Sequence, residues 1–213
     1  NIKMIHKPIV VVGAGPVGMV ATIKLAIAGH KDIMLLDANI NPSASGRESK
    51  TQDGRVLALS YASCKLLDDI GAWNNKHATA IKKIHISHSG MGTSSIDASD
   101  VHLPDLGYTI KYSDLCGQLS QCIANHSEIK LTQAVVKEVL PGKEFATIRY
   151  ADEQYLTAGL VVLAEGGQIK LSQVGYKEYD YKQVAIIATI KTELKHKNVA
   201  FERFDDSGAL VFL

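Results

Sequence analysis

Three glycines, Gly13, Gly15 and Gly18, form a GxGxxG pattern near the start of the sequence. The apolar run Ile9 to Val12 precedes them, and a mostly apolar run long enough for a helix follows. In such a strand-turn-helix, the first glycine makes the tight turn and the second leaves room for a pyrophosphate, while the third lets helix and strand pack closely. The helix N-terminus then presents amides and a partial positive charge to the anion. The spacing therefore predicts a phosphate-binding turn.

An acidic residue, Asp37, stands nineteen residues after Gly18, at the end of a second apolar run over 33–36. A carboxylate at this position of a βαβ unit accepts hydrogen bonds from a ribose. The glycines and the carboxylate together predict a dinucleotide site, and these residues alone leave FAD and NAD open. The alternative is an ordinary structural turn that an acidic residue follows by coincidence.

The elements that must position these residues follow from hydrophobic periodicity. A buried strand over 9–12 is expected to lead into a helix whose inner positions are Val17, Val20, Ala21, Leu25 and Ala28, with Gly29 as its left-handed end. Further predicted elements are a loop over 39–54, a helix over 61–70 capped by Ser60, a half-buried strand over 81–87, a helix opened by Ser113, and strands near 129–140, 145–150, 159–164, 184–190, 199–204 and 209–213.

The amino-acid composition and the motifs that are missing argue against several classes of function. The net charge of the 213 residues is +1, which argues against nucleic acid as a partner. The three cysteines, Cys64, Cys116 and Cys122, contain no CxxC pair, so we expect reduced thiols in a cytoplasmic protein. Lys24 interrupts the longest apolar run, so no membrane-spanning helix is predicted. The sequence also lacks GxSxG, HExxH and Walker motifs, and we predict neither a catalytic nucleophile nor a metal site.

Four longer stretches resemble one enzyme family. They are 53–73, 160–167 (LVVLAEGG), 181–190 (YKQVAIIATI) and 200–213 (AFERFDDSGALVFL). In this order they are similar to segments of the flavin-dependent aromatic hydroxylases that act on ubiquinone precursors. The resemblance covers nearly the entire chain.

The resemblance implies a doubly wound, Rossmann-like α/β fold that binds FAD or NAD(P), interleaved with an antiparallel β-sheet substrate domain. Under this interpretation residues 1–80 and 107–174 form the FAD-binding domain, and residues 81–106 and 175–213 belong to the substrate domain. The family's third FAD motif has no counterpart here, so the sequence is expected to be an N-terminal fragment, truncated at the C-terminus.

The implied activity is that of a monooxygenase, which uses FAD, NAD(P)H and O2 to hydroxylate a prenylated phenol. A cofactor of this kind carries the chemistry itself, which is consistent with the lack of a predicted nucleophile. Peripheral contact with the inner membrane or with a ubiquinone-biosynthesis complex is left open. Two alternatives also stay open: a non-catalytic or inactive FAD/NAD-binding fragment, and an NAD-dependent dehydrogenase.

The resemblance also adds residues to the site. It implies that Arg55 contacts the cofactor near the flavin and that Lys111, where the family usually has Arg or Gln, contacts the phosphates. Glu165 replaces the usual aspartate of the second motif and is retained with Gly166. The complete predicted cofactor-binding set is Gly13, Ala14, Gly15, Pro16, Val17, Gly18, Asp37, Arg55, Lys111, Glu165 and Gly166.

Overall fold

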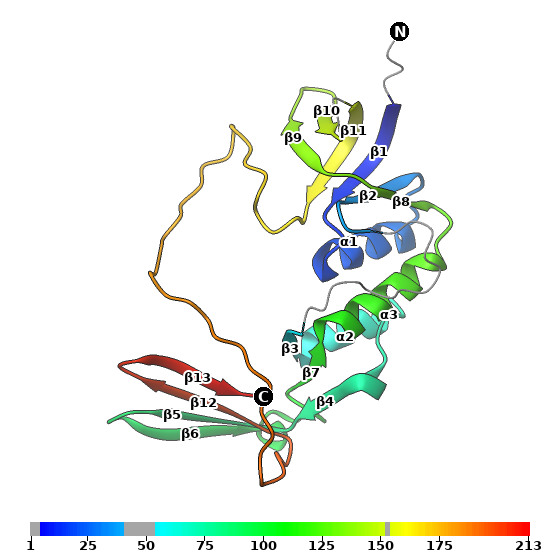
Figure 1. The fold of residues 1–213 in the computed structure, drawn as a ribbon. Coiled ribbons are helices and arrows are strands. Elements are labelled where there is room, and N and C mark those ends of the chain that lie inside the picture. Colours follow the sequence, from blue (N-terminus) through cyan, green and yellow to red (C-terminus); the bar gives the residue numbers. More distant parts are fainter. Residues whose placement is uncertain (1–4, 41–53, 152–153) are drawn as a thin grey trace. The chain divides into compact units, whose positions relative to one another are not determined.

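The chain forms two compact units, which we describe separately (Figure 1). The computed structural model describes residues 5–40, 54–151 and 154–213, so most of the predicted 39–54 loop lies outside the described residues. The first unit contains residues 1–50 and 116–183, and the second contains residues 51–115 and 184–213. Each unit is therefore assembled from two separate stretches of the sequence.

A six-stranded sheet with the order β8-β2-β1-β11-β10-β9 is the framework of the first unit. Strands β8, β2, β1 and β11 run parallel, and β10 and β9 continue the sheet in antiparallel fashion. The last four residues of β1 and the first four of β2 are fully buried, as expected for central parallel strands. The strands are β1 (Ile5–Val12), β2 (Ile33–Asp37), β8 (Ile129–Gln133), β9 (Val136–Leu140), β10 (Ala146–Tyr150) and β11 (Gln154–Leu163).

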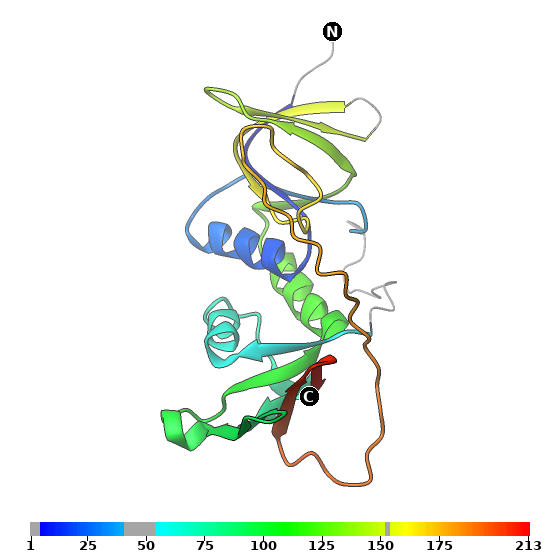
Figure 2. The same ribbon diagram turned by 90° about the vertical axis from the view of Figure 1, so that its left-hand side faces the viewer.

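The predicted first helix is confirmed as α1 (Pro16–Ile27), which packs against β1 and β2 (Figure 2). Gly29 follows it with φ +93°, the left-handed conformation that the sequence predicts. The predicted inner face is wrong, because Val17 is 74% exposed. The helix is apolar around most of its circumference, so periodicity could not select the buried side. The buried residues are Gly18, Met19, Thr22, Ile23 and Ala26.

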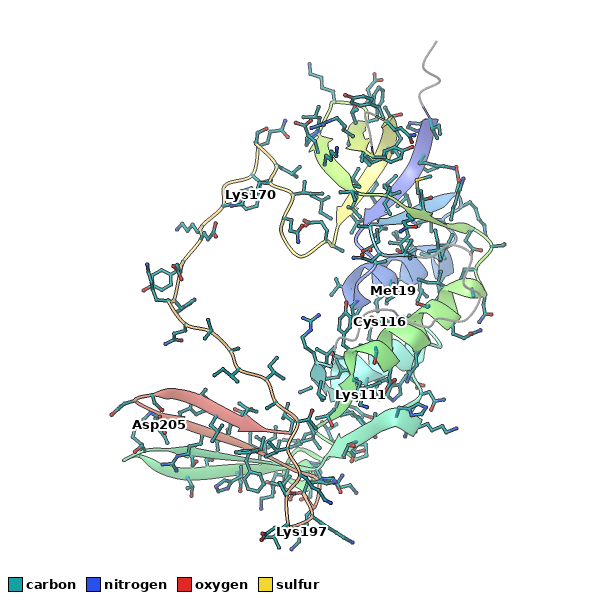
Figure 3. All side chains as sticks on the ribbon, in the orientation of Figure 1. Met19, Lys111, Cys116, Lys170, Lys197 and Asp205 are labelled. Carbon is teal, nitrogen blue, oxygen red and sulfur yellow. The ribbon has the colours of Figure 1, made fainter. Side chains whose placement is uncertain are left out.

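The second predicted long helix is α3 (Tyr112–Ala124), and it begins one residue before the expected Ser113. Leu115, Leu119 and Ile123 are buried, as predicted. Within the first unit α3 lies against α1, and Met19 of α1 faces α3 (Figure 3). The Ser120 hydroxyl of α3 lies 3.7 Å from the Met19 sulfur. In the described ranges no helix is both long enough and apolar enough to cross a bilayer.

Two smaller sheets form the second unit, with the orders β13-β12-β5-β6 and β3-β7-β4. The substrate sheet implied by the resemblance is antiparallel, whereas β12 pairs with β5 in parallel. The elements are β3 (Val56–Ser60), α2 (Tyr61–Asp69), η1 (Asn75–His77), β4 (Ala78–Ile81), β5 (Lys83–His88), β6 (Gly92–Asp97), η2 (Ala98–Val101), β7 (Gly107–Lys111), β12 (Val199–Asp205) and β13 (Gly208–Phe212).

One predicted strand of this unit is wrong. Residues 184–190 form no strand, and Val184 and Ile186 are 88% and 91% exposed. The β-branched composition that suggested a strand measures how well residues fit a pleated, partly buried surface. The structure gives this segment no neighbouring strand to provide that surface.

The predicted cap of α2, Ser60, is confirmed. The Ser60 Oγ accepts a hydrogen bond from the Ser63 amide at 3.2 Å. Replacing Ser60 by alanine removes this acceptor and is expected to lower the free energy of unfolding by about 1 kcal/mol. Urea unfolding of the variant would measure the change. Ser172→Ala, at an exposed position outside any helix, is the control and should be neutral; an equal loss in both variants would contradict the capping role.

All three cysteines are buried thiols. Burial raises the pKa of the Cys64 thiol to about 11 and also raises the pKa of the Cys122 thiol. Because the thiolate is the nucleophilic form, these side chains are held in their unreactive state at neutral pH. Their environment is that of structural cysteines packed in a core.

Candidate functional site

The turn between β1 and α1 is closed by two glycines that leave no room for a side chain. Gly13 has φ +102°, and a Cβ there would lie 2.5 Å from the carbonyl oxygen of Ala164. A Cβ on Gly18 would collide with the carbonyl oxygen of Gly13 and lie 3.2 Å from the Ala164 Cβ. Helix α1 therefore approaches the ends of β1 and β11 closely only because these positions are glycine.

The N-terminus of α1 carries no side-chain cap. Gly15 is the N-cap residue, Pro16 opens the first turn, and this turn contains no acidic residue. By contrast, Ser60, Asn74 and Asp97 cap the starts of α2, η1 and η2 with side-chain oxygens. The first-turn amides of α1 and the positive end of its dipole are thus left for an external acceptor, and an anion is the group they favour.

Asp37 lies at the mouth of this turn. Its Oδ2 accepts a hydrogen bond from the Ala14 amide at 2.8 Å, and its Oδ1 accepts one from the Asn39 amide at 2.7 Å. An ionised carboxylate has about four lone-pair sites, so two sites remain after these bonds. The side chain is partly exposed. Asp37 is therefore held in place by the backbone and can still accept hydrogen bonds from a ligand.

The end of β11 brings Glu165 beside the turn. The Ala164 amide donates to the Val12 carbonyl at 2.7 Å, which joins the ends of β11 and β1. The Glu165 carboxylate accepts hydrogen bonds from its own turn, from the Gly167 amide at 3.2 Å and the Gln168 amide at 2.6 Å. Gly166 has φ +88° and open space at its Cα. Glu165 thus rigidifies a tight turn next to the glycine turn between β1 and α1.

Arg55 and Lys111 belong to the second unit, so they are described apart from the turn. Val56 and Lys111 are partners in the β3–β7 ladder, which places Arg55 and Lys111 at the same end of these strands. The Arg55 guanidinium lies 4.7 Å from the centre of the Tyr112 ring, a cation–π contact, while Lys111 is exposed at the start of α3 (Figure 3). The structure brings these two cations together at one end of a sheet.

The described residues contain no group of three or more His, Cys, Asp or Glu side chains arranged to hold a metal ion. His85 lies in β5, where its ring makes an edge contact with Phe201 at 5.7 Å. The His88 ring instead contacts the carbonyl of the adjacent Ser89 at 2.9 Å. His85 and His88, three positions apart in the sequence, therefore have separate surroundings.

Comparison with known proteins assigns the family. Residues 8–210 match the family described as Glucose inhibited division protein A. The chain belongs to this family. The match covers β1 from Pro8 onward, the glycine turn, Asp37 and every other residue of the predicted site.

This family member is also similar to ubiquinone hydroxylases, as its sequence motifs predict. It is 25% identical over 219 residues to 3-demethoxyubiquinol 3-hydroxylase of Escherichia coli (strain K12), which covers 96% of this chain and 54% of that protein. It is also 25% identical over 224 residues to the ubiquinone hydroxylase UbiM of Neisseria meningitidis, with 98% and 47% covered. The chain spans about half the length of these relatives.

A solved structure supports the predicted fold class. The p-nitrophenol 4-monooxygenase PnpA of Pseudomonas putida DLL-E4 superposes with a TM-score of 0.62 at 19% identity, over 78% of this chain and 42% of that one. The likeness confirms the Rossmann-like α/β fold of FAD-dependent monooxygenases for this family member.

Two contributors to the site were missed from the sequence. Ala164 supplies both the carbonyl and the methyl group against which Gly13 and Gly18 pack, and the Asn39 amide holds the second oxygen of Asp37. A small residue at the end of the predicted strand over 159–164 was the signal for Ala164, since a larger side chain there would push α1 away. The Asn39 contact is an ordinary Asp-turn hydrogen bond to the amide two residues on.

Proposed function

We propose that this chain binds FAD through the β1–α1 turn and belongs to an FAD-dependent monooxygenase that inserts one oxygen atom of O2 into a phenolic ubiquinone precursor, with NAD(P)H as reductant. The relatives' names support the reaction class, because one hydroxylates 3-demethoxyubiquinol and another is a ubiquinone hydroxylase. The shared fold of FAD-dependent monooxygenases supports the cofactor.

One observation carries the proposal. The Asp37 carboxylate lies 2.8 Å from the Ala14 amide, beside a helix N-terminus that has no side-chain cap. This arrangement places an acceptor for ribose hydroxyls next to donors for a pyrophosphate, the two groups that neighbour each other in an adenine dinucleotide. The absence of a side chain at Gly15 would let the phosphates approach the backbone.

In the proposed complex, residues 13–18 hold the pyrophosphate and Asp37 holds the ribose. Arg55, Lys111, Glu165 and Gly166 are proposed as further contacts. FAD, when bound, supplies the redox chemistry that links NAD(P)H oxidation to oxygen insertion. The chain itself binds and orients the reactants and excludes water, which are the tasks that its backbone amides and apolar surfaces can perform.

The same proposal assigns separate segments of the chain to the cofactor and to the substrate. Residues 1–80 and 107–174 serve the cofactor, and residues 81–106 and 175–213 serve the prenylated phenol. Contact with a membrane surface or with other proteins of ubiquinone biosynthesis would bring such an apolar substrate to the enzyme, and this contact remains a prediction.

The Asp37→Ala variant tests the proposal. It removes the ribose acceptor and the anchor of the Ala14 amide, and we expect it to weaken FAD binding about tenfold or more. Quenching of flavin fluorescence during titration of FAD with the purified chain would measure the affinity. Asp69→Ala, on an exposed face of α2, is the matched control and should bind FAD normally.

Two outcomes would overturn the proposal. One is that Asp37→Ala binds FAD as tightly as the wild type does. The other is that the wild-type chain does not bind FAD; binding of NAD instead would favour the NAD-dependent dehydrogenase alternative.

A further inference from the structure

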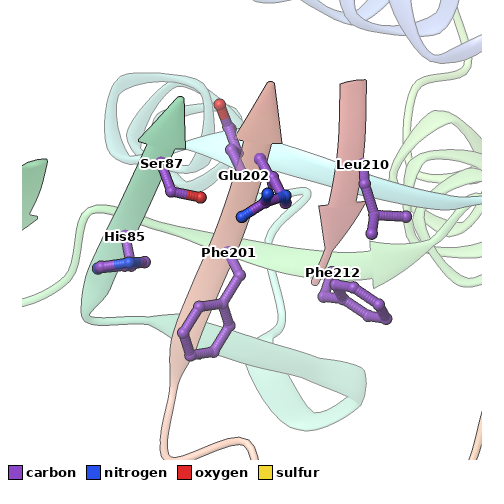
Figure 4. A pocket seen from close by; sticks show the side chains of 7 residues that line it. His85, Ser87, Phe201, Glu202, Leu210 and Phe212 are labelled. Carbon is purple, nitrogen blue, oxygen red and sulfur yellow. The ribbon is translucent and has the colours of Figure 1, made fainter. Parts of the chain in front are cut away.

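The β13-β12-β5 region of the four-stranded sheet carries a hollow of about 350 Å³ (Figure 4). The hollow lies entirely within the second unit. Its lining combines aromatic and aliphatic surface with two nitrogen-bearing side chains. The lining residues are His85, Ser87, Phe201, Glu202, Arg203, Leu210 and Phe212.

Strand register explains why these side chains share one face. Phe201 is paired with His85 on β5 and with Phe212 on β13. In the same way Arg203 is paired with Ser87 and Leu210. Residues directly opposite each other, and residues two apart along a strand, point to the same side of a sheet. All six side chains therefore project into the hollow.

Among the lining residues, Glu202 is the one whose side chain does not project into the hollow. It lies between Phe201 and Arg203 on β12 and is paired with Ile86 and Val211, so alternation turns its carboxylate to the other face. The hollow is consequently lined by the Glu202 backbone, and its charged side chain is Arg203. Asp205, two residues along β12, lies on the same side of the sheet as Arg203.

The apolar walls of the hollow are open to solvent. Phe201 and Phe212 are each 44% exposed, and Leu210 is 53% exposed. The His85 ring meets Phe201 edge to face, with 5.7 Å between the ring centres. Such an arrangement of ring faces and edges favours a further aromatic ring, which gains burial and an offset or edge contact.

Arg203 is held from one side. Its Nε lies 3.8 Å from Asp205 Oδ2, while Asp205 Oδ1 accepts hydrogen bonds from the amide and hydroxyl of Ser207. The hydrogen bonds from Ser207 lower the pKa of the Asp205 carboxyl, so it is ionised at neutral pH. A guanidinium has five N–H donors, and one long contact at Nε does not use those of the two terminal nitrogens. These remain to bind an anion.

We propose that this hollow binds an aromatic ring bearing an ionised oxygen, and that Arg203 is the residue that recognises the charge. The inference rests on the proposed function, since it names a feature of the phenolic substrate. Phe201, Phe212 and Leu210 take the ring, while the Arg203 guanidinium forms a charge-assisted hydrogen bond to the phenolate or carboxylate oxygen. A neutral ring of the same shape gains only the apolar contact.

Calorimetric titration with three small rings tests the site. The probes are 4-nitrophenol at a pH where it is ionised, benzoate, and neutral nitrobenzene. We expect the wild-type chain to bind at least one of the two anions about tenfold more tightly than nitrobenzene. The tighter of the two anions identifies the oxygen as phenolate or carboxylate.

Substitutions at Arg203 separate charge recognition from ring binding. Arg203→Gln should remove the preference for the anion and leave nitrobenzene binding unchanged, whereas Arg203→Lys should keep much of the preference. Arg149→Gln, on β10 of the first unit, removes an arginine elsewhere and should behave as wild type. Circular dichroism of each variant would confirm that it is folded.

The inference fails if the wild type binds anionic and neutral rings equally, if it binds none of them, or if Arg203→Gln keeps the preference. FAD affinity of the same samples distinguishes this failure from that of the proposed function. Normal FAD binding without anion preference overturns only the role of Arg203. Anion preference without FAD binding overturns the proposed function.

Discussion

Replacing Gly18 by alanine is expected to lower the free energy of unfolding by about 2 to 3 kcal/mol and to weaken FAD binding strongly. The new Cβ would overlap the Gly13 carbonyl oxygen, which is backbone and cannot rotate away. Relief requires α1 to move outward from β1 and β11, and this movement displaces the first-turn amides that we propose as phosphate donors. Urea unfolding and titration with FAD would measure the two effects.

Gly117→Ala is the matched control for this substitution. Gly117 lies inside α3, and a Cβ there meets nothing within 4 Å. Alanine is the better helix former, so this variant should gain up to about 1 kcal/mol of stability. The close approach of α1 would be contradicted by a Gly18→Ala protein that is as stable as the wild type.

Replacing Tyr108 by phenylalanine is expected to lower the free energy of unfolding by about 2 kcal/mol. The Tyr108 hydroxyl donates to Asp105 Oδ2 at 2.6 Å, and Asp105 is only 9% exposed. Among the described residues, Asp105 Oδ1 has no hydrogen-bond partner. Loss of the hydroxyl would leave both oxygens of a buried carboxylate unsatisfied, which costs more than the bond contributes.

The same contact predicts a pH dependence. The hydrogen bond to Asp105, followed by burial, raises the pKa of Tyr108 to about 12 from a usual value of 10. The folded state thus holds the phenol proton more tightly than the unfolded state. The stability that Tyr108 contributes is complete below pH 10 and is lost as the pH rises through 12.

Unfolding of wild type and Tyr108→Phe between pH 8 and pH 12 would reveal this dependence as a stability difference that shrinks with rising pH. Tyr181→Phe, at a side chain that is 73% exposed, should match the wild type throughout. A difference between wild type and Tyr108→Phe that stays constant with pH would contradict the role of the hydroxyl proton.

The parts of the fold that the sequence predicts are those with a strong local pattern. The βαβ unit, α3 and the caps at Ser60 and Gly29 depend on neighbours a few residues away, and all are present. Strands β3, β4, β6 and β7 were not predicted, or only in part. They are four to six residues long, and β6 (GTSSID) is largely polar, so pairing with distant strands creates them.

Residues 184–190 show the opposite error, in which a strong local preference finds no partner strand. The residues of the candidate site also differ in whether local sequence spacing could predict them. The glycines and Asp37 could be placed together from spacing alone, because one βαβ unit carries them all. Ala164 could not, since it reaches the turn only through the pairing of β11 with β1. The ligand contacts of the whole predicted set remain a prediction.

The pairing of β11 with β1 affects how the chain folds during its synthesis. Strand β1 lies between β2 and β11. His6 of β1 is paired with Thr157 of β11, and the two residues are 151 positions apart in the chain. During synthesis β1 and β2 emerge early, and one edge of β1 stays open until β11 leaves the ribosome. Contacts of such long range slow folding and leave apolar strand edges exposed to other chains meanwhile. The buried half of β1, its last four residues, is thus enclosed on both sides only after β11 has been made.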